Sequence, residues 1–479
     1  MAPTLYMSEI SPSCRAVLMA AKTLGLTLKV KKIDLAKNEQ LTSHFLKQIN
    51  PQHTIPTLID NGFVIWDSHA IIAFLVGKYG NDDELYSQDI MERALIDQRL
   101  HFDSSVVNNF TRTILNPMLY EHFNINLDDH KVSIHKTYAL MEKFLRSFPW
   151  IAGRKVTIAD LSLIPSITSL NVLVPIDKAE YPNLTNWIER AEALPCYVEN
   201  KNGLNQLRNL LHGKCCCPCF SLDWSSFCVR GWFKVLPYRV ISEKAIIRCS
   251  DFEQCEYRVL IKMGKLKLYY AQMSPAARSS LLTIEALGLD VELVPINLVA
   301  GEHLTPQFLK KNPLHTVPTL EDGDFHLFDS HAINAYLVSK YGKDDSLYPK
   351  DPEKRAIVDQ RLHFDSGIVF PRMGAIVVAL LRGGAKTIEK DKADLVSQAY
   401  QSLETLLEGK KYVAGNELTI ADFSLIATIS SLNSAIVPIA SNTYPRISEW
   451  LSRMQALPYY KTNQIGVDQF KGMIQSKLA

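Results

Sequence analysis

Short apolar runs and helical runs alternate over the first 80 residues or so, and almost only helical runs follow. Four short apolar or alternating runs predict strands: residues 3–6, 28–33, 57–59 and 63–66. The last two flank Asp60-Asn61-Gly62, a turn signal that predicts a hairpin. Three runs have helical spacing: residues 14–24, 68–78 and 90–211. The order βαβ, loop, ββα and then helices predicts an α/β domain followed by an all-α domain.

The same pattern and the same motifs occur twice. His53-Thr-Ile-Pro56-Thr-Leu recurs as His315-Thr-Val-Pro318-Thr-Leu, at an offset of 262 residues. Residues 53–104 and 315–366 share 33 identities in 52 aligned positions. Solenoid repeats have periods of roughly 20–50 residues, so this long period indicates a duplicated globular unit. We expect five segments: 1–82 and 88–212 in the first copy, a connector 213–262, then 263–344 and 350–479 in the second copy.

Each helical region carries the signature of a capping box. Thr157-Ile-Ala-Asp160 places threonine at the N-cap and aspartate at the third helical position, and Thr419-Ile-Ala-Asp422 repeats it. The first box starts a run that stays uncharged from Leu161 to Ile176. That run is only 16 residues long and contains Ser, Thr, Asn and Pro, so we interpret it as a buried helix and not as a membrane span.

Composition and charge are those of an ordinary globular protein. The chain has 479 residues, of which 47% are hydrophobic and 21% charged, and a net charge of +2. This charge gives no overall bias toward nucleic acid or anionic lipid. The N-terminus has neither a basic region nor a long apolar region, so we expect no signal peptide, no membrane association and a cytoplasmic location.

The cysteines are unevenly placed. Seven of the nine lie between Cys215 and Cys255, which is not a framework that would pin a secreted chain. The connector holding them has no clear period, and Met263 looks like an independent start. We expect a poorly ordered connector, arising from fusion of adjacent genes or from an error in the gene model. A soft-metal site and palmitoylation are less favoured alternatives, and the cysteine spacing matches no known zinc module.

The motifs together resemble those of the cytosolic glutathione transferases, most closely the insect epsilon class with the delta class as neighbour. They are, in the first copy, Ser11-Pro-Ser-Cys14-Arg15, Asn50 to Leu58, Asp67 to Ile71, Leu100 to Ser104 and Thr157 to Asp160, and in the second, Ser274 to Arg278, Asn312 to Leu320, Asp329 to Ile333 and Pro445 to Trp450. The resemblance covers about 1–212 and 263–470. It implies two units, each a thioredoxin-like βαβ-ββα domain followed by an all-helical domain. It also implies glutathione as co-substrate and no permanently bound cofactor.

Ser11 and Ser274 are the candidate catalytic residues. Each would open a helix, where unpaired N–H groups and a partial positive charge stabilise an anion and acidify a thiol. The resemblance implies that the anion is the glutathione thiolate; the alternative is a plain N-cap serine. Cys14 could suggest a Ser-x-x-Cys redox site, but the second copy has Ala277 there. We therefore interpret Cys14 as a small packing residue.

The resemblance also implies the groups that bind glutathione. Cis bonds at Pro56 and Pro318 would expose the backbone of Ile55 and Val317 to the cysteinyl part of the peptide. At the γ-glutamyl end, the implied contacts are Asp67 and Ser68 in the first copy and Asp329 and Ser330 in the second. At the glycyl carboxylate, they are His53 and Gln40 in the first copy and His315 and His303 in the second. His69 and His331 are further implied glutathione-binding residues. The alternatives are trans prolines at a strand edge, helix capping by Asp or Ser, and solvated surface histidines. Because Gln40 carries no charge, we expect weaker glutathione binding in the first copy.

The helix after His101-Phe-Asp-Ser104 should line the pocket for a hydrophobic electrophile. The candidates are Thr111, Arg112, Leu115 and Leu119 in the first copy and Met373 and Val377 in the second, with ordinary core packing as an equal alternative. Epsilon-type chains resemble the first copy in having arginine at Arg112, where the second has Gly374. We therefore expect two different electrophile specificities, and we expect no metal site.

The reaction implied is attack of the glutathione thiolate on an electrophilic carbon, with halide elimination or peroxide reduction as further possibilities and detoxification as the role. The first alternative is a non-catalytic protein that binds hydrophobic ligands, and the second is a structural or regulatory module. The family normally forms dimers of one unit. Because a 50-residue connector can span ~35–43 Å, we expect an intramolecular pseudo-dimer or a homo-oligomer.

Overall fold

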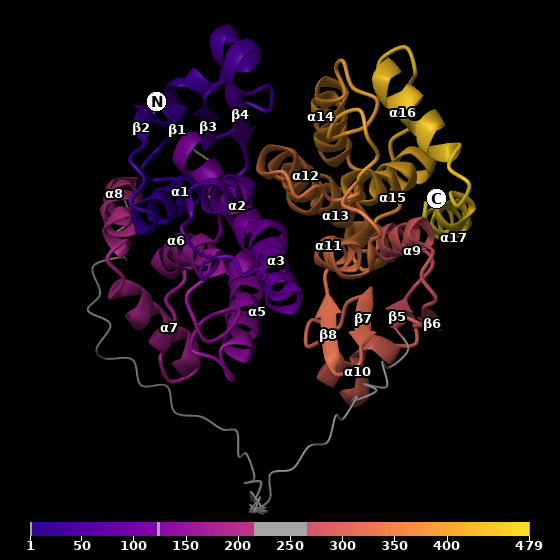
Figure 1. Ribbon diagram of the computed structural model, residues 1–479, viewed down its shortest axis with the longest axis horizontal. Helices are drawn as coiled ribbons and strands as arrows, with labels where there is room; N and C mark the ends of the chain where they lie inside the picture. The colour runs from indigo at the N-terminus through magenta and orange to yellow at the C-terminus, as the bar shows by residue number, and fades with distance from the viewer. Residues whose placement is uncertain (1, 122–124, 215–265, 479) are drawn as a thin grey trace, which may run out of the picture.

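The computed structural model describes residues 2–121, 125–214 and 266–478. Figure 1 shows two lobes, each built from one copy of the repeat. The cysteine-rich tract, and with it our interpretations of residues 215–262 and Met263, lies outside the described residues.

Each lobe contains a four-stranded mixed sheet. The strand order is β2-β1-β3-β4 in the first and β6-β5-β7-β8 in the second, with the first two strands of each sheet parallel and the remaining pairs antiparallel. The strands are β1 (Thr4–Met7), β2 (Lys29–Lys32), β3 (Thr57–Asp60), β4 (Phe63–Trp66), β5 (Lys267–Tyr270), β6 (Glu292–Pro295), β7 (Thr319–Asp322) and β8 (Phe325–Phe328). The helices of these domains are α1 (Pro12–Thr23), α2 (Ser68–Tyr79), α9 (Pro275–Leu287), α10 (Pro306–Lys311) and α11 (Ser330–Tyr341), with short helical turns η1 (Leu35–Lys37), η2 (Glu39–Leu41), η3 (Phe45–Ile49) and η8 (Glu302–Leu304). The predicted thioredoxin-like domain is confirmed in both copies.

Helices alone follow each sheet, as predicted. The first lobe has α3 (Ile90–Phe102), η4 (Asp103–Val107), α4 (Asn108–Phe110), η5 (Thr111–Leu115), η6 (Pro117–Glu121), α5 (Asp128–Phe144), α6 (Ile158–Leu173), α7 (Pro182–Glu192) and α8 (Tyr197–Lys214). The second has α12 (Pro352–Phe364), η9 (Asp365–Val369), α13 (Phe370–Leu381), α14 (Lys390–Leu406), α15 (Ile420–Ala435), α16 (Pro445–Gln455) and α17 (Lys461–Gln475). Pro371 is the second residue of α13 and directly follows the π-helical turn η9.

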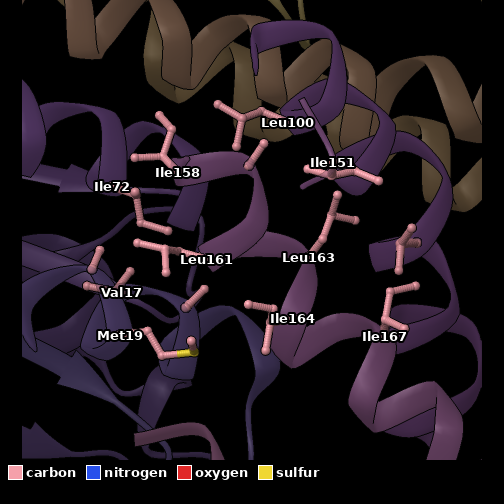
Figure 2. Packing of buried hydrophobic residues seen from close by; sticks show 14 of the residues in the cluster. Val17, Met19, Ile72, Leu100, Ile151, Ile158, Leu161, Leu163, Ile164 and Ile167 are labelled. Carbon is pink, nitrogen blue, oxygen red and sulfur yellow. The ribbon is translucent and has the colours of Figure 1, made fainter. Parts of the chain in front are cut away.

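Both capping boxes are present at the starts of α6 and α15. The carboxylate of Asp160 also accepts hydrogen bonds from the Ile151 backbone N–H and from Nε1 of Trp187, each at 2.9 Å. Helix α6 therefore starts at one buried, fully used carboxylate. Figure 2 shows Leu161 and Ile164 of α6 packed near Val17 and Ile72 of the preceding domain, so this helix joins the two domains in one core.

The two copies differ in length by one residue near position 49. Up to this point the copies align at an offset of 263, as Ser11 with Ser274, and beyond it at 262, as Asn50 with Asn312. The extra residue is accommodated by a π-helical turn, η3, where the second copy has the regular helix α10. A π-helical turn has i→i+5 hydrogen bonds, so it holds one residue more than an α-helical turn.

The lobes pack against each other through the helices at the centre of Figure 1, α2 and α3 against α12 and α11. Nε2 of Gln98 donates to the carbonyl oxygen of Phe328 at 2.8 Å, and Gln360 makes the matching bond to Trp66 at 2.8 Å. The two halves are thus related by an approximate two-fold arrangement.

One described helical run, Pro352–Leu381, is long and apolar enough to cross a membrane by length and composition alone. Its side chains Leu362, Val369, Met373 and Ile376 are buried in the core of the second lobe. This run is therefore the core helix of a folded domain.

Candidate active site

Ser11 and Ser274 occupy the same position, at the N-cap of α1 and of α9. Each hydroxyl oxygen accepts a long hydrogen bond of 3.4 Å, from the backbone N–H of Cys14 or of Ala277. Both side chains are partly exposed. Burial raises the pKa of the Cys14 thiol, and a hydrogen bond with the Ser11 hydroxyl opposes that effect. Each O–H can still turn toward an anion at the positive end of its helix.

Cys14 lies one turn into the same helix and is fully buried. Burial raises the pKa of its thiol to about 11, so the thiol stays protonated at neutral pH. This agrees with the interpretation of Cys14 as a packing residue.

The predicted cis bonds are present at Ile55-Pro56 and Val317-Pro318. The loop before each is held by a buried asparagine. Nδ2 of Asn50 donates to the carbonyl oxygen of Thr54 at 3.0 Å and to Oγ1 of Thr57 at 3.1 Å. Asn312 makes the same contacts in the second copy. The two halves therefore have the same loop structure at the backbone of Ile55 and Val317, which would meet the cysteinyl part of glutathione.

Asp67 and Asp329 cap α2 and α11 from a left-handed backbone conformation, each with φ of 74°. Oδ1 of Asp67 accepts from the backbone N–H groups of His69 and Ala70 at 2.9 and 3.3 Å. No hydrogen bond from another described residue reaches Oδ2 of either aspartate, and each side chain is 22% exposed. Each aspartate can therefore offer one carboxylate oxygen to a cation.

Ser68 and Ser330 follow at the first helical position and are buried, at 3% and 4% exposure. Their backbone N–H groups belong to the unpaired set at a helix start. An anion next to the cation held by the aspartate would meet these groups.

Gln40 and His303 occupy equivalent positions in the two copies, and each side chain has one buried polar atom without a hydrogen-bond partner among the described residues. Oε1 of Gln40 and Nδ1 of His303 have no hydrogen bond within the described part of the chain. The ring of His303 lies 6.0 Å from that of His315. Burial, followed by the neighbouring His315 and Arg382, lowers the pKa of His303, and burial likewise lowers that of His53. These histidines are therefore neutral before a ligand arrives.

His69 and His331 do not point toward this ligand space. Both ring nitrogens of His69 are engaged, Nδ1 with Asp67 at 3.0 Å and Nε2 with Asp103 at 3.1 Å. The ring is 2% exposed and stacks on His363 of the other half. A direct contact of either ring with glutathione, as the sequence motif implied, does not fit this geometry, because both nitrogens are already engaged.

Two clusters bring possible metal-ligating atoms within 4.8 Å of one another: Asp67, His69 and His363, and His101, Asp329 and His331. Nδ1 of His69 and of His331 contacts an aspartate carboxylate, and Nδ1 of His101 and of His363 contacts a serine hydroxyl. The clusters therefore serve as hydrogen-bonded contacts between the halves.

The candidate electrophile residues divide into two groups. Leu115, Leu119 and Met373 are buried in the cores of their halves, which favours the packing alternative for them. Thr111 and Val377 are partly exposed. Arg112 is exposed but donates through Nη1 to the backbone oxygen of Gly367 in the other half, a contact that Gly374 cannot return.

The sequence analysis missed one position beside the site. Tyr120 and Arg382 align with each other, and they differ in chemistry. Burial raises the pKa of Tyr120, and the next influences are Cys14 and Ser8 near the start of α1. Arg382 lies close enough to His303 to lower its pKa. The signal available in the sequence was the substitution itself, at the end of the helix expected to line the pocket.

Comparison with known proteins agrees with this arrangement. Family models described as glutathione S-transferase, N-terminal domain, match residues 10–76 and 264–339, and models of the C-terminal domain match 124–190 and 382–462. Glutathione S-transferase 1 of Manduca sexta is 48% identical over 216 residues, which is 45% of this chain and 99% of that protein. Glutathione S-transferase D7 of Anopheles gambiae is 40% identical over 215 residues, 44% of this chain and 97% of its own.

Two solved structures are also similar. A glutathione transferase homologue from Drosophila mojavensis, solved with bound glutathione, is 47% identical with a TM-score of 0.44, covering 45% of this chain and 98% of that one. An epsilon-class glutathione S-transferase from the housefly, Musca domestica, is 46% identical with a TM-score of 0.44, covering 44% and 98%. A two-domain unit with a serine-capped helix, occurring twice, defines a tandem transferase. The chain belongs to the glutathione S-transferase family and carries its N- and C-terminal domains twice.

Proposed function

We propose that each half binds glutathione and conjugates its thiolate to a small hydrophobic electrophile, in a cytoplasmic detoxifying role. The observation that carries this is the partly exposed hydroxyl of Ser11 and of Ser274 at a helix N-terminus, in both halves. Each serine would donate a hydrogen bond to the thiolate, while the helix end lowers the free energy of the anion. Attack on an electrophilic carbon then forms the C–S bond and expels the leaving group.

The surrounding groups would hold the peptide. The free Oδ2 of Asp67 or Asp329 would take the α-ammonium, and the helix start at Ser68 or Ser330 would take the adjacent carboxylate. The backbone at Ile55 or Val317 would pair with the cysteinyl residue. His53 with Gln40, and His315 with His303, would bind the glycyl carboxylate. In this assignment the unpartnered atoms of Gln40 and His303 receive a ligand.

We retain the division into domains 1–82, 88–212, 263–344 and 350–479, and we propose that the halves pair as an intramolecular pseudo-dimer. The contacts of Gln98 and Gln360 across the lobes support this pairing.

The test is a conjugation assay with a chlorinated aromatic on the parent chain and on the double variant Ser11→Ala, Ser274→Ala. Loss of one oriented hydrogen bond to a charged group costs about 1.5–3 kcal/mol, so turnover should fall roughly ten- to a hundredfold. Calorimetry should show that glutathione still binds, because the peptide contacts remain. Equal turnover in the variant and the parent would contradict the assignment.

A second candidate function is binding of hydrophobic ligands without chemistry. A cavity of about 640 Å³ lies between the halves. Apolar residues such as Phe74 and Val338 line it together with charged ones, among them Arg93, Asp97, Arg355 and Asp359. A ligand held there should bind equally well to the parent and to the serine double variant. Turnover by the parent would show that this is not its only activity.

A further inference from the structure

Each half inserts one aromatic side chain of its sheet into the other half, and these two side chains differ in size. Trp66, at the end of β4, is 8% exposed and belongs to the buried cluster of the second half. Phe328, at the end of β8, is 5% exposed and belongs to the buried cluster of the first half. Figure 1 shows β4 beside α12 and β8 beside α3. The two positions are equivalent in the repeat, and we call Trp66 and Phe328 the knob residues.

The residue beside each knob residue also differs, and in the opposite sense. The ring of Phe328 stacks on Phe144 of the first half, with centroids 6.4 Å apart and planes inclined by 23°. The equivalent of Phe144 in the second half is Leu406, which lies in the same buried cluster as Trp66. Tryptophan is larger than phenylalanine, and phenylalanine is larger than leucine. The larger knob residue therefore has the smaller neighbour, and the smaller knob residue has the larger neighbour.

The surroundings of each knob residue within its own half follow the same difference. Nε1 of Trp66 donates a hydrogen bond to Oε1 of Gln52 at 2.5 Å. The second copy has Leu314 at the position of Gln52, and Phe328 has no N–H group to satisfy. Because a buried indole N–H needs an acceptor, Trp66 and Gln52 form one unit. The two copies thus differ in a coordinated way around this contact.

A second contact between the halves is also one-sided. Arg112 donates through Nη1 to the backbone oxygen of Gly367. A Cβ atom at position 367 would lie only 3.1 Å from Nη2 of Arg112, which is closer than an ordinary van der Waals contact, and the first copy has Ser105 at this position. The second copy has Gly374 in place of Arg112. This contact therefore fits only between a first half and a second half.

An exposed ion pair between the halves has a weaker influence. Nζ of Lys78 lies 3.1 Å from Oε1 of Glu353, with the side chains 27% and 48% exposed. The first copy has Met91 at the position of Glu353, and the second copy has Lys340 at the position of Lys78. Two second halves could form this ion pair twice. Because exposed ion pairs contribute little to stability, the buried knob residues decide which halves pair.

We propose that the interface selects a first half paired with a second half and rejects a pair of like halves. This inference rests on the proposed pairing of the halves. Two first halves would press Trp66 against Phe144 at both contacts, and extra atoms in a packed core destabilise it. Two second halves would leave Phe328 beside Leu406, and the unfilled space also destabilises. Only the mixed pair fills both contacts, so every paired molecule carries one candidate site of each kind.

Thermal unfolding of the full chain tests the size match. Leu406→Phe sets phenylalanine against Trp66, as in two first halves, and should lower the Tm by about 4–8 °C. Phe144→Leu sets leucine against Phe328, as in two second halves, and should lower the Tm by about 3–6 °C.

Two controls and a compensating variant complete this experiment. Leu395→Phe, on α14 like Leu406, and Phe148→Leu are changes of the same kinds at exposed positions, and each should keep the Tm within about 1 °C. The triple variant Gln52→Leu, Trp66→Phe, Leu406→Phe sets two phenylalanines at both contacts. It should recover the Tm of the parent to within about 2 °C.

Cleavage of the folded chain tests the selection itself. A protease site placed between residues 214 and 266 allows the chain to be cut after folding, so that only the contacts between the halves hold them together. Isotope-labelled and unlabelled cut protein are incubated until the labels have mixed, and native mass spectrometry identifies the pairs. The cut parent should contain almost only mixed pairs. The cut triple variant should contain all three kinds of pair, with the Arg112 contact as the remaining bias toward the mixed one.

Each outcome bears on one of the two proposals. If the cut parent separates into single halves, the proposed pairing fails, and the selection fails with it. If the cut parent forms pairs of like halves, or the cut triple variant forms only mixed pairs, the halves pair without selection by size and only this inference is overturned. It is also overturned if Leu406→Phe and Phe144→Leu keep the Tm of the parent, or if the triple variant unfolds at the same temperature as Leu406→Phe alone.

Discussion

Gln98 in the first half donates a hydrogen bond of 2.8 Å to the backbone oxygen of Phe328 in the second half. Both Gln98 and Gln360, which makes the matching bond to Trp66, are 1% exposed. A buried carbonyl that loses its donor keeps its desolvation cost, which is why this contact bears on the stability of the paired halves.

We predict that Gln98→Leu lowers the free energy of unfolding by about 1–3 kcal/mol, the cost of an unsatisfied buried polar group. Gln360→Leu should cost a similar amount. Urea denaturation followed by circular dichroism would measure both, with Gln401→Ala on an exposed helix face as control. A midpoint equal to that of the parent would mean that water replaces the amide at this contact.

A second prediction concerns Ser280, a buried residue of the second copy whose equivalent in the first copy is Val17. Oγ of Ser280 is fully buried and lacks a hydrogen-bond partner among the described residues, and Val17 fills the equivalent place in the first copy. Ser280→Val should therefore stabilise the second half by about 1 kcal/mol. The reverse change, Val17→Ser, should destabilise the first half by about 1–3 kcal/mol. Thermal unfolding of both variants tests this, and destabilisation by Ser280→Val would show that the second copy is too tightly packed for the larger side chain.

Much of the fold and of the candidate site could be predicted from the sequence, and the features that could not have physical causes. The capping boxes and the hairpin depend on local chemistry that a motif carries, so they were predictable. The cis prolines followed only from the family resemblance, because the residues by themselves also allow trans prolines. His69 and His331 were misplaced as direct glutathione ligands because their role depends on rings from the other half, and pairing across a boundary leaves no local signal. The π-helical turn at Phe45–Ile49 could be located only by comparing the two copies.

A third prediction concerns unequal affinity. We expect the second half to bind glutathione more tightly, because His303 stands where the first half has Gln40. Burial, His315 and Arg382 lower the pKa of His303 in the free protein, and a bound carboxylate favours the protonated ring. Affinity at the second site should therefore rise as pH falls from 7.5 to 5.5, more steeply than at the first.

Calorimetric titration of the parent chain and of Gln40→His at both pH values, fitted with two sites, would measure this. Gln40→His should give the first site the steeper pH dependence of the second. Tighter binding by the unmodified first site at both pH values would show that Tyr120, Arg112 or another difference outweighs the exchange.

The last prediction concerns Asp359, buried between the halves with 7% exposure. Burial raises the pKa of this carboxyl to about 6, against the opposing effect of Arg355. The unfolded chain has an ordinary aspartate pKa of about 3.9. At a pH between these two pKa values, Asp359 is protonated in the folded state and ionised in the unfolded state. The contribution to stability is therefore full below about pH 4 and is lost as pH rises through about 6.

Asp359→Asn should flatten this part of the profile, because asparagine has no proton to lose and its oxygen can still accept the 2.7 Å hydrogen bond from Tyr348. Urea midpoints at pH 4.5, 5.5 and 7 would show it, with the exposed Asp324→Asn as control. Asp97 and Asp422 also have raised pKa values because of burial, so some slope should remain. A variant whose midpoint falls as steeply as that of the parent would mean that Asp359 is already ionised throughout this range, because the cationic Arg355 on the same helix lowers its pKa more than burial raises it.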